Sequence, residues 1–388
     1  MKYLGGQATK VFALDNPRVE TLWEYLKRLY GYKTGIVSTA DMTDATPAGE
    51  GGHSFDRCLG YDIAKQYVNG TFVAAPTFDL ILGGGKDRFE SRTVSNSGDT
   101  QNLTNDLVAL GFTNVGTRTA LNALPSGASA PNKLVGFFRI SNMNVAYEKL
   151  ALTRPTDEPL PSFGGFTDQP FLDEMTSKAI ATLSKNNSPF ILMVEGASID
   201  KQSHPNHAAG VIWDTIELDK SVAVGRAFAN GSGLNTKTLV IVTADHDQSM
   251  QITECVDTTT ANFVTNTRSN SVYPRTIALH DSGSGTLAPS NSGNNAEVGL
   301  FPNYQDLNSD GYPENANRYQ ISVGFRTGNH TGSSVPCSAD SLGAMMFTGY
   351  YDQTDIFFKM AKTLSSETSP LVEAGKILGK FSTVSPNY

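Results

Sequence analysis

Five short apolar runs mark the first two thirds of the chain. They cover residues 34–40, 78–85, 133–140, 189–196 and 238–246 and lead into Gly, Ser, Thr or Asp. The runs are continuously hydrophobic instead of alternating, which is typical of strands buried on both faces of a sheet. We therefore predict that these runs form the central strands of a largely parallel sheet.

Segments with helical periodicity lie between these runs, at residues 19–31, 170–186 and 208–231. The last of them ends at a glycine suited to cap a helix. Strands that alternate with helices predict an α/β fold, a three-layer sandwich with a central, mostly parallel sheet flanked by helices. Such sheets bind ligands beyond the carboxyl ends of their strands, where Glu195, Asp245 and His246 stand.

Residues 250–318 interrupt the alternation and are rich in Thr, Asn, Ser and Gly. A stretch of this length and composition is usually a functional insertion or a surface loop. We expect a single domain, 1–388, in which this loop-rich insertion lies near the mouth of the active site.

Part of that insertion imitates the start of a calcium-binding loop. Asp306, Asn308 and Asp310 alternate before Gly311, which is the opening pattern of an EF-hand loop. Asn317 stands where the EF-hand needs its bidentate glutamate, so a full EF-hand is excluded. A turn with solvated carboxylates is the favoured interpretation.

The formal net charge of the 388 residues is −8. This disfavours nucleic acid or an anionic membrane as the main partner, because both attract clustered Lys and Arg. Bound metal changes the balance, since three divalent cations would leave a net charge of about −2 and concentrate their charge in one cleft. Local field would then draw in an anionic substrate.

The three cysteines, Cys58, Cys255 and Cys337, include no CxxC pair, so the sequence has neither a zinc knuckle nor a redox motif. The sequence is compatible with one disulfide and with no disulfide. No run approaches the roughly 18 apolar residues of a membrane span, and the first residues lack the apolar core of a signal peptide.

Asp200 and His204 are four residues apart, which places both on one face of a helix. Carboxylate oxygen and imidazole nitrogen are standard zinc ligands, and Glu195 ends the strand that leads into this helix. A helix start with exposed polar residues is the structural alternative, because such pairs are common by chance.

Asp245 and His246 follow a buried strand. Adjacent residues point to opposite faces within a strand, but at its end both can reach one ion; a polar strand exit is the alternative. His330 stands among small residues and, taken alone, is best explained as a loop histidine. The remaining histidines are His53, His207 and His280, of which only the second, close to His204, is a weak rival ligand.

Thr46 and Pro47 suit the N-cap and first position of a helix, which would explain Thr46 without any metal. Arg57 is either a surface arginine or, near metal ligands, a bidentate contact to phosphate oxygens.

Together these segments resemble the alkaline phosphatases, and within them the bacterial type. The five matching motifs are DAT at 44–46, an arginine thirteen residues beyond Asp44, VEGASIDKQSH at 194–204, TADH at 243–246 and HTG at 330–332. In addition, the tail at 350–360 is similar to the C-terminal helix of the family. The resemblance extends from about residue 1 to about residue 365, and five ordered motifs make it specific.

The resemblance implies two zinc ions and one magnesium ion. Its first zinc would be held by Asp200, His204 and His330. Its second zinc would be held by Asp245 and His246. Its magnesium would be served by Glu195 and Thr46.

The resemblance also implies that Arg57 binds two phosphate oxygens. Asp44 and Lys201 would form a pair that shapes the magnesium site and meets phosphate through water. The implied activity is hydrolysis of phosphate monoesters, in which two metals stabilise the attacking and leaving oxygens. Alternatives are a phosphodiesterase or sulfatase on the same scaffold, or an inactive metal-binding fragment.

Two parts of the family pattern have no counterpart in this sequence. One is an Asp-Gly turn with a metal-bridging aspartate, and the other is an Asp-Ser-Ala segment with the nucleophilic serine, some fifty residues before DAT. Asp44 lies too close to Met1 for that spacing. The resemblance therefore implies an N-terminally truncated chain with weak activity and an unpaired sheet edge. It implies a periplasmic or secreted homodimer for the full-length protein.

Overall fold

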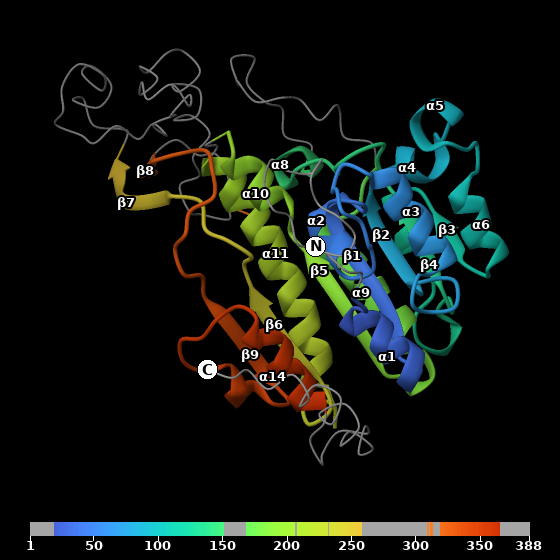
Figure 1. Cartoon of the computed structure of the whole chain (residues 1–388). Coiled ribbons are helices and arrows are strands. Elements are labelled where there is room, and N and C mark those ends of the chain that lie inside the picture. The colour runs from blue at the N-terminus through green and yellow to red at the C-terminus, as the bar shows by residue number, and fades with distance from the viewer. Residues whose placement is uncertain are drawn as a thin grey trace. The chain divides into compact units, whose positions relative to one another are not determined.

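The computed structural model describes residues 19–150, 168–205, 208–231, 233–257, 309, 311–312 and 319–364. The chain divides into two compact units, and Figure 1 labels their helices and strands. Unit 1 comprises Met1–Ser221 and Gln248–His330, and unit 2 comprises Val222–Asp247 and Thr331–Tyr388. No helix among the described residues is long and apolar enough to cross a membrane.

A five-stranded parallel sheet forms the centre of unit 1, with the order β3-β4-β2-β1-β5. Its strands are β1 Lys33–Asp41, β2 Leu80–Gly84, β3 Thr113–Val115, β4 Leu134–Phe137 and β5 Phe190–Glu195. Four of them coincide with the predicted apolar runs, so the predicted α/β fold with a mostly parallel sheet is confirmed. β3 has only three residues, of which two are exposed, and therefore carried no apolar signal.

Helices pack on both faces of this sheet. In chain order, the helices up to residue 229 are α1 Leu22–Tyr30, α2 Ala45–Gly49, α3 Gly60–Asn69, α4 Lys86–Glu90, α5 Val94–Ser97, α6 Leu103–Ala109, α7 Arg118–Asn122, α8 Ala146–Lys149, α9 Leu172–Leu183, α10 Ser198–Ser203 and α11 Ala208–Ala229. The last of these has residues in both units. The predicted helices 19–31, 170–186 and 208–231 correspond to α1, α9 and α11.

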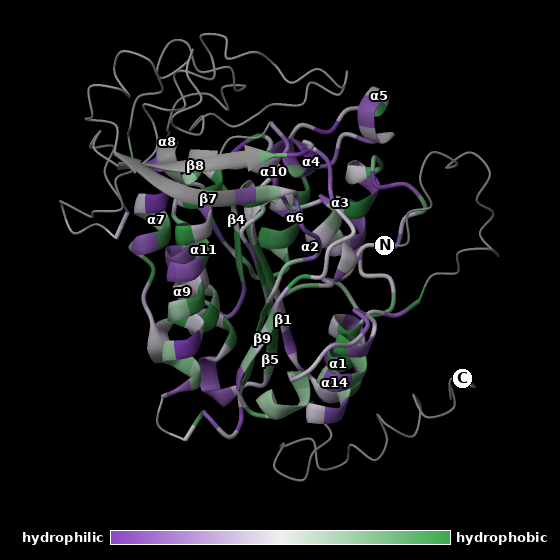
Figure 2. Cartoon of the chain, turned by 90° about the vertical axis from the view of Figure 1, so that its left-hand side faces the viewer, coloured by the Kyte–Doolittle hydropathy of each residue, from purple (hydrophilic) through white to green (hydrophobic). Residues whose placement is uncertain are grey.

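Neighbouring residues of β1 separate the two hydrophobic cores. Ile36 packs in the core formed with α3, α4 and α6, whereas Val37 packs in the core formed with α7 and α9. This is the alternation expected of a strand with helices on both faces. Figure 2 shows hydrophobic and hydrophilic positions together on α9, as expected for a helix with one face on the sheet.

Local signals explain how α1 begins and ends. Thr21 accepts a hydrogen bond from the Glu24 backbone N–H, and the Glu24 carboxylate accepts one from the Thr21 N–H, which is a capping box. Gly31, with φ +67°, ends the helix in the left-handed region.

The predicted cap of α2 is wrong. Asp44, not Thr46, is the N-cap, and its carboxylate accepts a hydrogen bond from Ala45 N–H at 2.8 Å. Thr46 and Pro47 stand inside the first turn, where a missing backbone donor is tolerated because those N–H groups have no intrahelical partner.

The rest of unit 1 includes an antiparallel pair, β7 Met250–Asp257 and β8 Tyr319–Phe325. Most of the predicted insertion 250–318 lies outside the described residues, as do Asp306, Asn308 and Asp310 of the calcium-loop hypothesis. The sheet ends at β5, whose six residues are all half-buried.

In unit 2, β6 Leu239–Thr243 pairs antiparallel with β9 Cys337–Ser341. The unit also contains the short 3-10 helix η4 Ala344–Phe347 and α14 Asp355–Leu364. The last element occupies the tail that resembled the C-terminal helix of the family. The run 238–246, predicted to be a central strand of the parallel sheet, instead forms β6 and pairs antiparallel with β9, so this part of the prediction is wrong.

Candidate metal and phosphate site

The turn from β5 into α10 carries the first group of predicted site residues. Glu195 is the last residue of β5, Asp200 lies in the first turn of α10, and His204 is its C-cap. The His204 backbone N–H donates to the Asp200 carbonyl at 3.0 Å, which closes the turn. The spacing of four residues therefore places both side chains on one helical face, as predicted.

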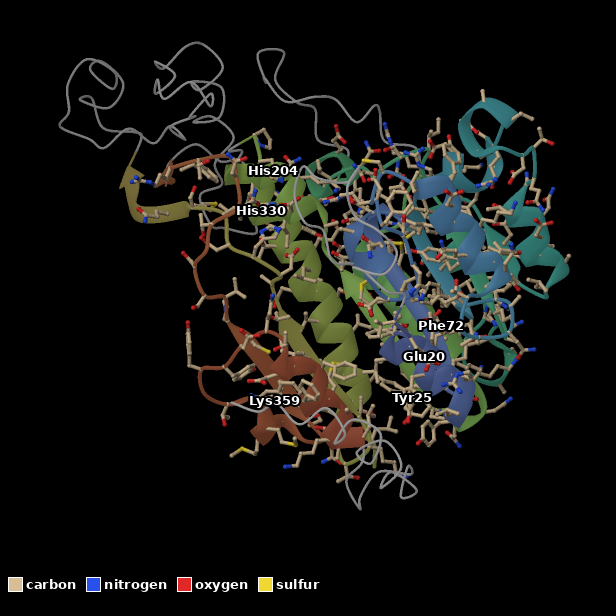
Figure 3. The ribbon with its side chains drawn as sticks, viewed as in Figure 1. Glu20, Tyr25, Phe72, His204, His330 and Lys359 are labelled. Carbon is tan, nitrogen blue, oxygen red and sulfur yellow. The ribbon has the colours of Figure 1, made fainter. Side chains whose placement is uncertain are left out.

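His330 joins this pair from the loop after β8. The His204 and His330 Nε2 atoms are 3.3 Å apart, and they lie 3.3 and 3.4 Å from Asp200 Oδ1. Figure 3 shows the two histidines next to each other. Three potential ligand atoms thus form a nearly equilateral triangle, although 126 residues separate the two histidines in the chain.

The contact made by His204 Nδ1, the ring nitrogen outside this triangle, determines the tautomer of the imidazole. Nδ1 lies 2.6 Å from the Gly328 carbonyl oxygen. A carbonyl can only accept a hydrogen bond, so Nδ1 carries the proton and Nε2 presents its lone pair. This is the arrangement that a metal-binding histidine needs.

The predicted second zinc pair belongs to unit 2. His246 Nε2 lies 3.3 Å from Asp245 Oδ2, so the two adjacent side chains do turn toward each other at the strand end. The Asp245 side chain is 74% exposed. The following residue, Asp247, accepts hydrogen bonds from the Thr331 N–H and hydroxyl, at 2.8 and 2.5 Å.

The predicted magnesium residues meet around Glu195. Ser38 donates its hydroxyl to Glu195 Oε2 at 2.5 Å, and the Thr46 side chain also forms a hydrogen bond with this carboxylate. Burial raises the pKa of Glu195 above its ordinary value, and the two hydroxyl groups and the Lys201 charge only partly counter it. A half-buried carboxylate with a raised pKa gains from a cation placed beside it.

Asp44 connects the two predicted phosphate-binding cations. Lys201 Nζ lies 2.8 Å from its Oδ2, and Arg57 Nη2 lies 2.6 Å from its Oδ1. Burial opposes ionisation of Asp44, but the Lys201 charge and the hydrogen bonds from Lys201, Ala45 and Arg57 outweigh it and lower the pKa to about 2. Half of the Arg57 side chain is exposed, so the guanidinium is accessible to a ligand.

A comparison with protein families matches the alkaline phosphatase model to residues 9–366, nearly the whole chain. The chain belongs to the alkaline phosphatase family. This confirms the resemblance that the ordered motifs indicated, and it shows that the motifs matched as one framework and not as five coincidences.

Individual alkaline phosphatases support this membership. The alkaline phosphatase of Escherichia fergusonii is 30% identical over 369 residues, which are 90% of this chain and 68% of the relative. Alkaline phosphatase H of Pseudomonas aeruginosa is 30% identical over 361 residues, 88% of this chain and 66% of the relative. The chain thus spans about two thirds of the length of these curated relatives.

Solved structures agree on the fold. A mutant TAB5 alkaline phosphatase with Mg bound in its M3 site has a TM-score of 0.59 and 25% identity, and the match covers 90% of this chain and 76% of that one. Metal cofactors are therefore a property of the alkaline phosphatase structures that this chain resembles.

Among the described residues of this alkaline phosphatase chain, His53, Cys58 and Cys337 are not part of these groups. His53 pairs with buried Glu24 at 2.9 Å and supports the start of α1. His207 and His280 lie outside the described residues. Cys58 and Cys337 are free thiols in the described part of the chain.

Several supporting groups were missed by reasoning from the sequence. Ser38 could have been found, because parallel pairing of the two predicted strands places it beside Glu195, where β5 ends. The Gly328 carbonyl, which accepts from His204 Nδ1, gave no signal. A glycine is not informative about a site until the fold is known.

Proposed function

We propose that this chain acts on phosphate monoesters at a divalent-metal centre, with Asp200, His204 and His330 as the ligands of one zinc ion. The triangle of ligand atoms supports this proposal most directly. Zinc bonds of about 2.0–2.1 Å in a tetrahedral site place ligand atoms roughly 3.3–3.4 Å apart. The observed separations of 3.3, 3.3 and 3.4 Å have this size.

Two further ions complete the proposal. Asp245 and His246, 3.3 Å apart, offer one oxygen and one nitrogen to a second zinc. Glu195 and Thr46 offer oxygen atoms to magnesium, which prefers oxygen ligands. When bound, these ions supply Lewis acidity to the phosphoryl oxygens and to the attacking and leaving groups.

The protein side chains hold and orient the substrate. Arg57 uses one N–H group on Asp44, and its planar fork retains donors that suit two phosphoryl oxygens. Asp44 stays ionised at neutral pH because its pKa is about 2. It therefore holds Lys201 and Arg57 as charged donors on either side of one carboxylate.

The chain is tested with zinc and magnesium against a chromogenic phosphate monoester, the matching diester and the matching sulfate ester. We expect metal-dependent release from the monoester, a higher KM for Arg57→Lys, and no such change for Arg28→Lys, whose partner is Glu20 on the surface of unit 1. Faster turnover of the diester or sulfate ester would replace this function with one of the alternatives.

The nucleophile is a separate part of the proposal. The family resemblance assigns the nucleophile to the serine of an Asp-Ser-Ala segment, which these 388 residues do not contain, so we expect them to be a feeble catalyst that still binds zinc. Export to the periplasm or medium and homodimer formation remain predictions. Assaying the chain beside an N-terminally extended form tests the serine, since equal rates would place the nucleophile within these residues.

A further inference from the structure

A strained turn precedes β7, close to the zinc ligands of unit 1. Ser249 has φ +31°, in the region that side chains other than glycine rarely adopt. The Met250 N–H donates to the Gln248 carbonyl and closes the turn around Ser249. Such a conformation persists only where neighbouring interactions impose it, and it is concentrated at functional sites.

The Ser249 hydroxyl supplies those interactions. It accepts hydrogen bonds from the Arg326 and Thr327 N–H groups, each at 3.1 Å, and donates to the Thr327 carbonyl at 2.9 Å. One hydroxyl has one donor and two acceptor sites. All three sites of the Ser249 hydroxyl bind backbone groups at the start of the loop after β8.

That loop supplies two groups to the proposed zinc site. The Thr327 hydroxyl accepts from the Asn329 N–H at 3.1 Å, which extends the fixed geometry one residue pair further. Gly328 then presents its carbonyl to His204 Nδ1, and His330 presents its own ring to the triangle. The loop position thus sets the tautomer of one ligand and the place of another.

We infer that Ser249 is a positioning residue for the zinc site, acting through the backbone of residues 326–330. The inference rests on the proposed function, because it takes His204 and His330 as zinc ligands. Ser249 itself contributes no ligand. Its hydroxyl fixes the loop, and the strained φ is the cost of aiming that hydroxyl at two consecutive N–H groups.

Two substitutions separate the hydroxyl from the strain. Ser249→Ala removes the hydroxyl and keeps the strained turn, whereas Ser249→Gly removes the hydroxyl and relieves it, because glycine adopts positive φ freely. Loss of a group that orients a metal-binding histidine typically costs about 10–100-fold in metal affinity. We expect both variants to lose zinc affinity in that range.

Zinc affinity is measured by competition with a chromogenic chelator, and site geometry by the visible spectrum of the cobalt-substituted chain. Ser188→Ala is the matched control, since its hydroxyl also holds a turn carbonyl, that of Lys185 at 3.0 Å, but lies on a different turn of unit 1. We expect the control to match the unaltered chain and both Ser249 variants to change the cobalt spectrum.

Ser249→Gly tests the inference even if the strained Ser249→Ala variant folds poorly. Zinc affinity and a cobalt spectrum equal to those of the unaltered chain would overturn the inference. If the unaltered chain itself binds no zinc, the proposed metal centre fails, and that result is distinct from a variant that binds as well as its parent.

Discussion

Two groups of charged side chains in unit 1 occupy opposite environments. The site group, Asp44, Arg57, Asp200, His204 and His330, is partly exposed, with 48% of the Arg57 and His330 side chains accessible. The α8–α11 network, which consists of Lys149, Asp214 and Glu217, is sealed from solvent, with each residue no more than 2% exposed.

The two groups also differ in how their charges are compensated. In the α8–α11 network, Lys149 Nζ lies 2.5 Å from Glu217 Oε1, and Asp214 accepts the Ala146 N–H at 3.0 Å. Compensation there comes from the protein itself. In the site group, by contrast, we propose that a bound metal ion and a bound phosphate compensate the charges of the side chains. The α8–α11 network therefore stabilises the fold, whereas the site group is suited to bind a ligand.

The largest expected effect is the loss of stability in Lys149→Met. This substitution keeps the volume of the aliphatic stem but leaves the Glu217 carboxylate buried without its cation. Breaking a buried pair by removing one partner costs about 3–5 kcal/mol. Urea unfolding of the metal-free chain measures this loss, and zinc affinity should stay within experimental error. A stable variant would show that water or rearrangement compensates the network.

The reverse pattern is expected for His330→Ala. About 10–16 kcal/mol of zinc binding shared over four ligands in zinc fingers is roughly 3 kcal/mol per ligand, or about 100-fold in affinity. The half-exposed side chain contributes little to folding, so the urea midpoint of the metal-free chain should change by less than about 0.5 kcal/mol. Chelator competition measures the first effect. An unchanged zinc affinity would remove His330 from the site.

The fold followed largely from the sequence because its signals are local. Apolar runs such as 189–196 are strands buried in a parallel sheet, and the Asp200–His204 spacing is helical geometry. Where two neighbouring residues both suited the same position, the prediction was wrong. At α2, Asp44 and not Thr46 is the N-cap.

Long-range partners could not be read in the same way. Lys149 and Glu217 are 68 residues apart, and His204 meets the Gly328 carbonyl across 124 residues. No periodicity encodes such pairs. The family pattern placed His330 near His204, but it contained nothing about Ser249, whose role depends on backbone atoms that every residue possesses.

An intermediate effect is expected for Asp214→Asn. Burial, and then the neighbouring Glu217, raise the pKa of Asp214 well above its ordinary value. The folded chain therefore keeps a proton that the unfolded chain loses near pH 4, and stability falls as pH rises from there toward the folded pKa, by up to about 1.4 kcal/mol per pH unit.

Asparagine is neutral throughout this pH range, so Asp214→Asn should remove this slope. Its stability relative to the unaltered chain should increase with pH. Urea unfolding in a pH series from about 5 to about 8 tests the sign. Parallel curves for the two proteins would show that Asp214 does not hold the proton.

The smallest expected effect is the matched control, Lys86→Met. Lys86 pairs with Glu90 on one face of α4 at 3.5 Å, and 45% of its side chain is exposed. Exposed pairs four residues apart on a helix contribute about 0.3–0.5 kcal/mol, and salt screens them. The same exchange of lysine for methionine should therefore cost roughly a tenth of what it costs at position 149. Added salt should abolish the effect of Lys86→Met and leave that of Lys149→Met unchanged, because only the buried pair is shielded from ions. Equal losses at the two positions, or equal sensitivity to salt, would contradict the distinction between a buried network that holds the fold and exposed charges that do not.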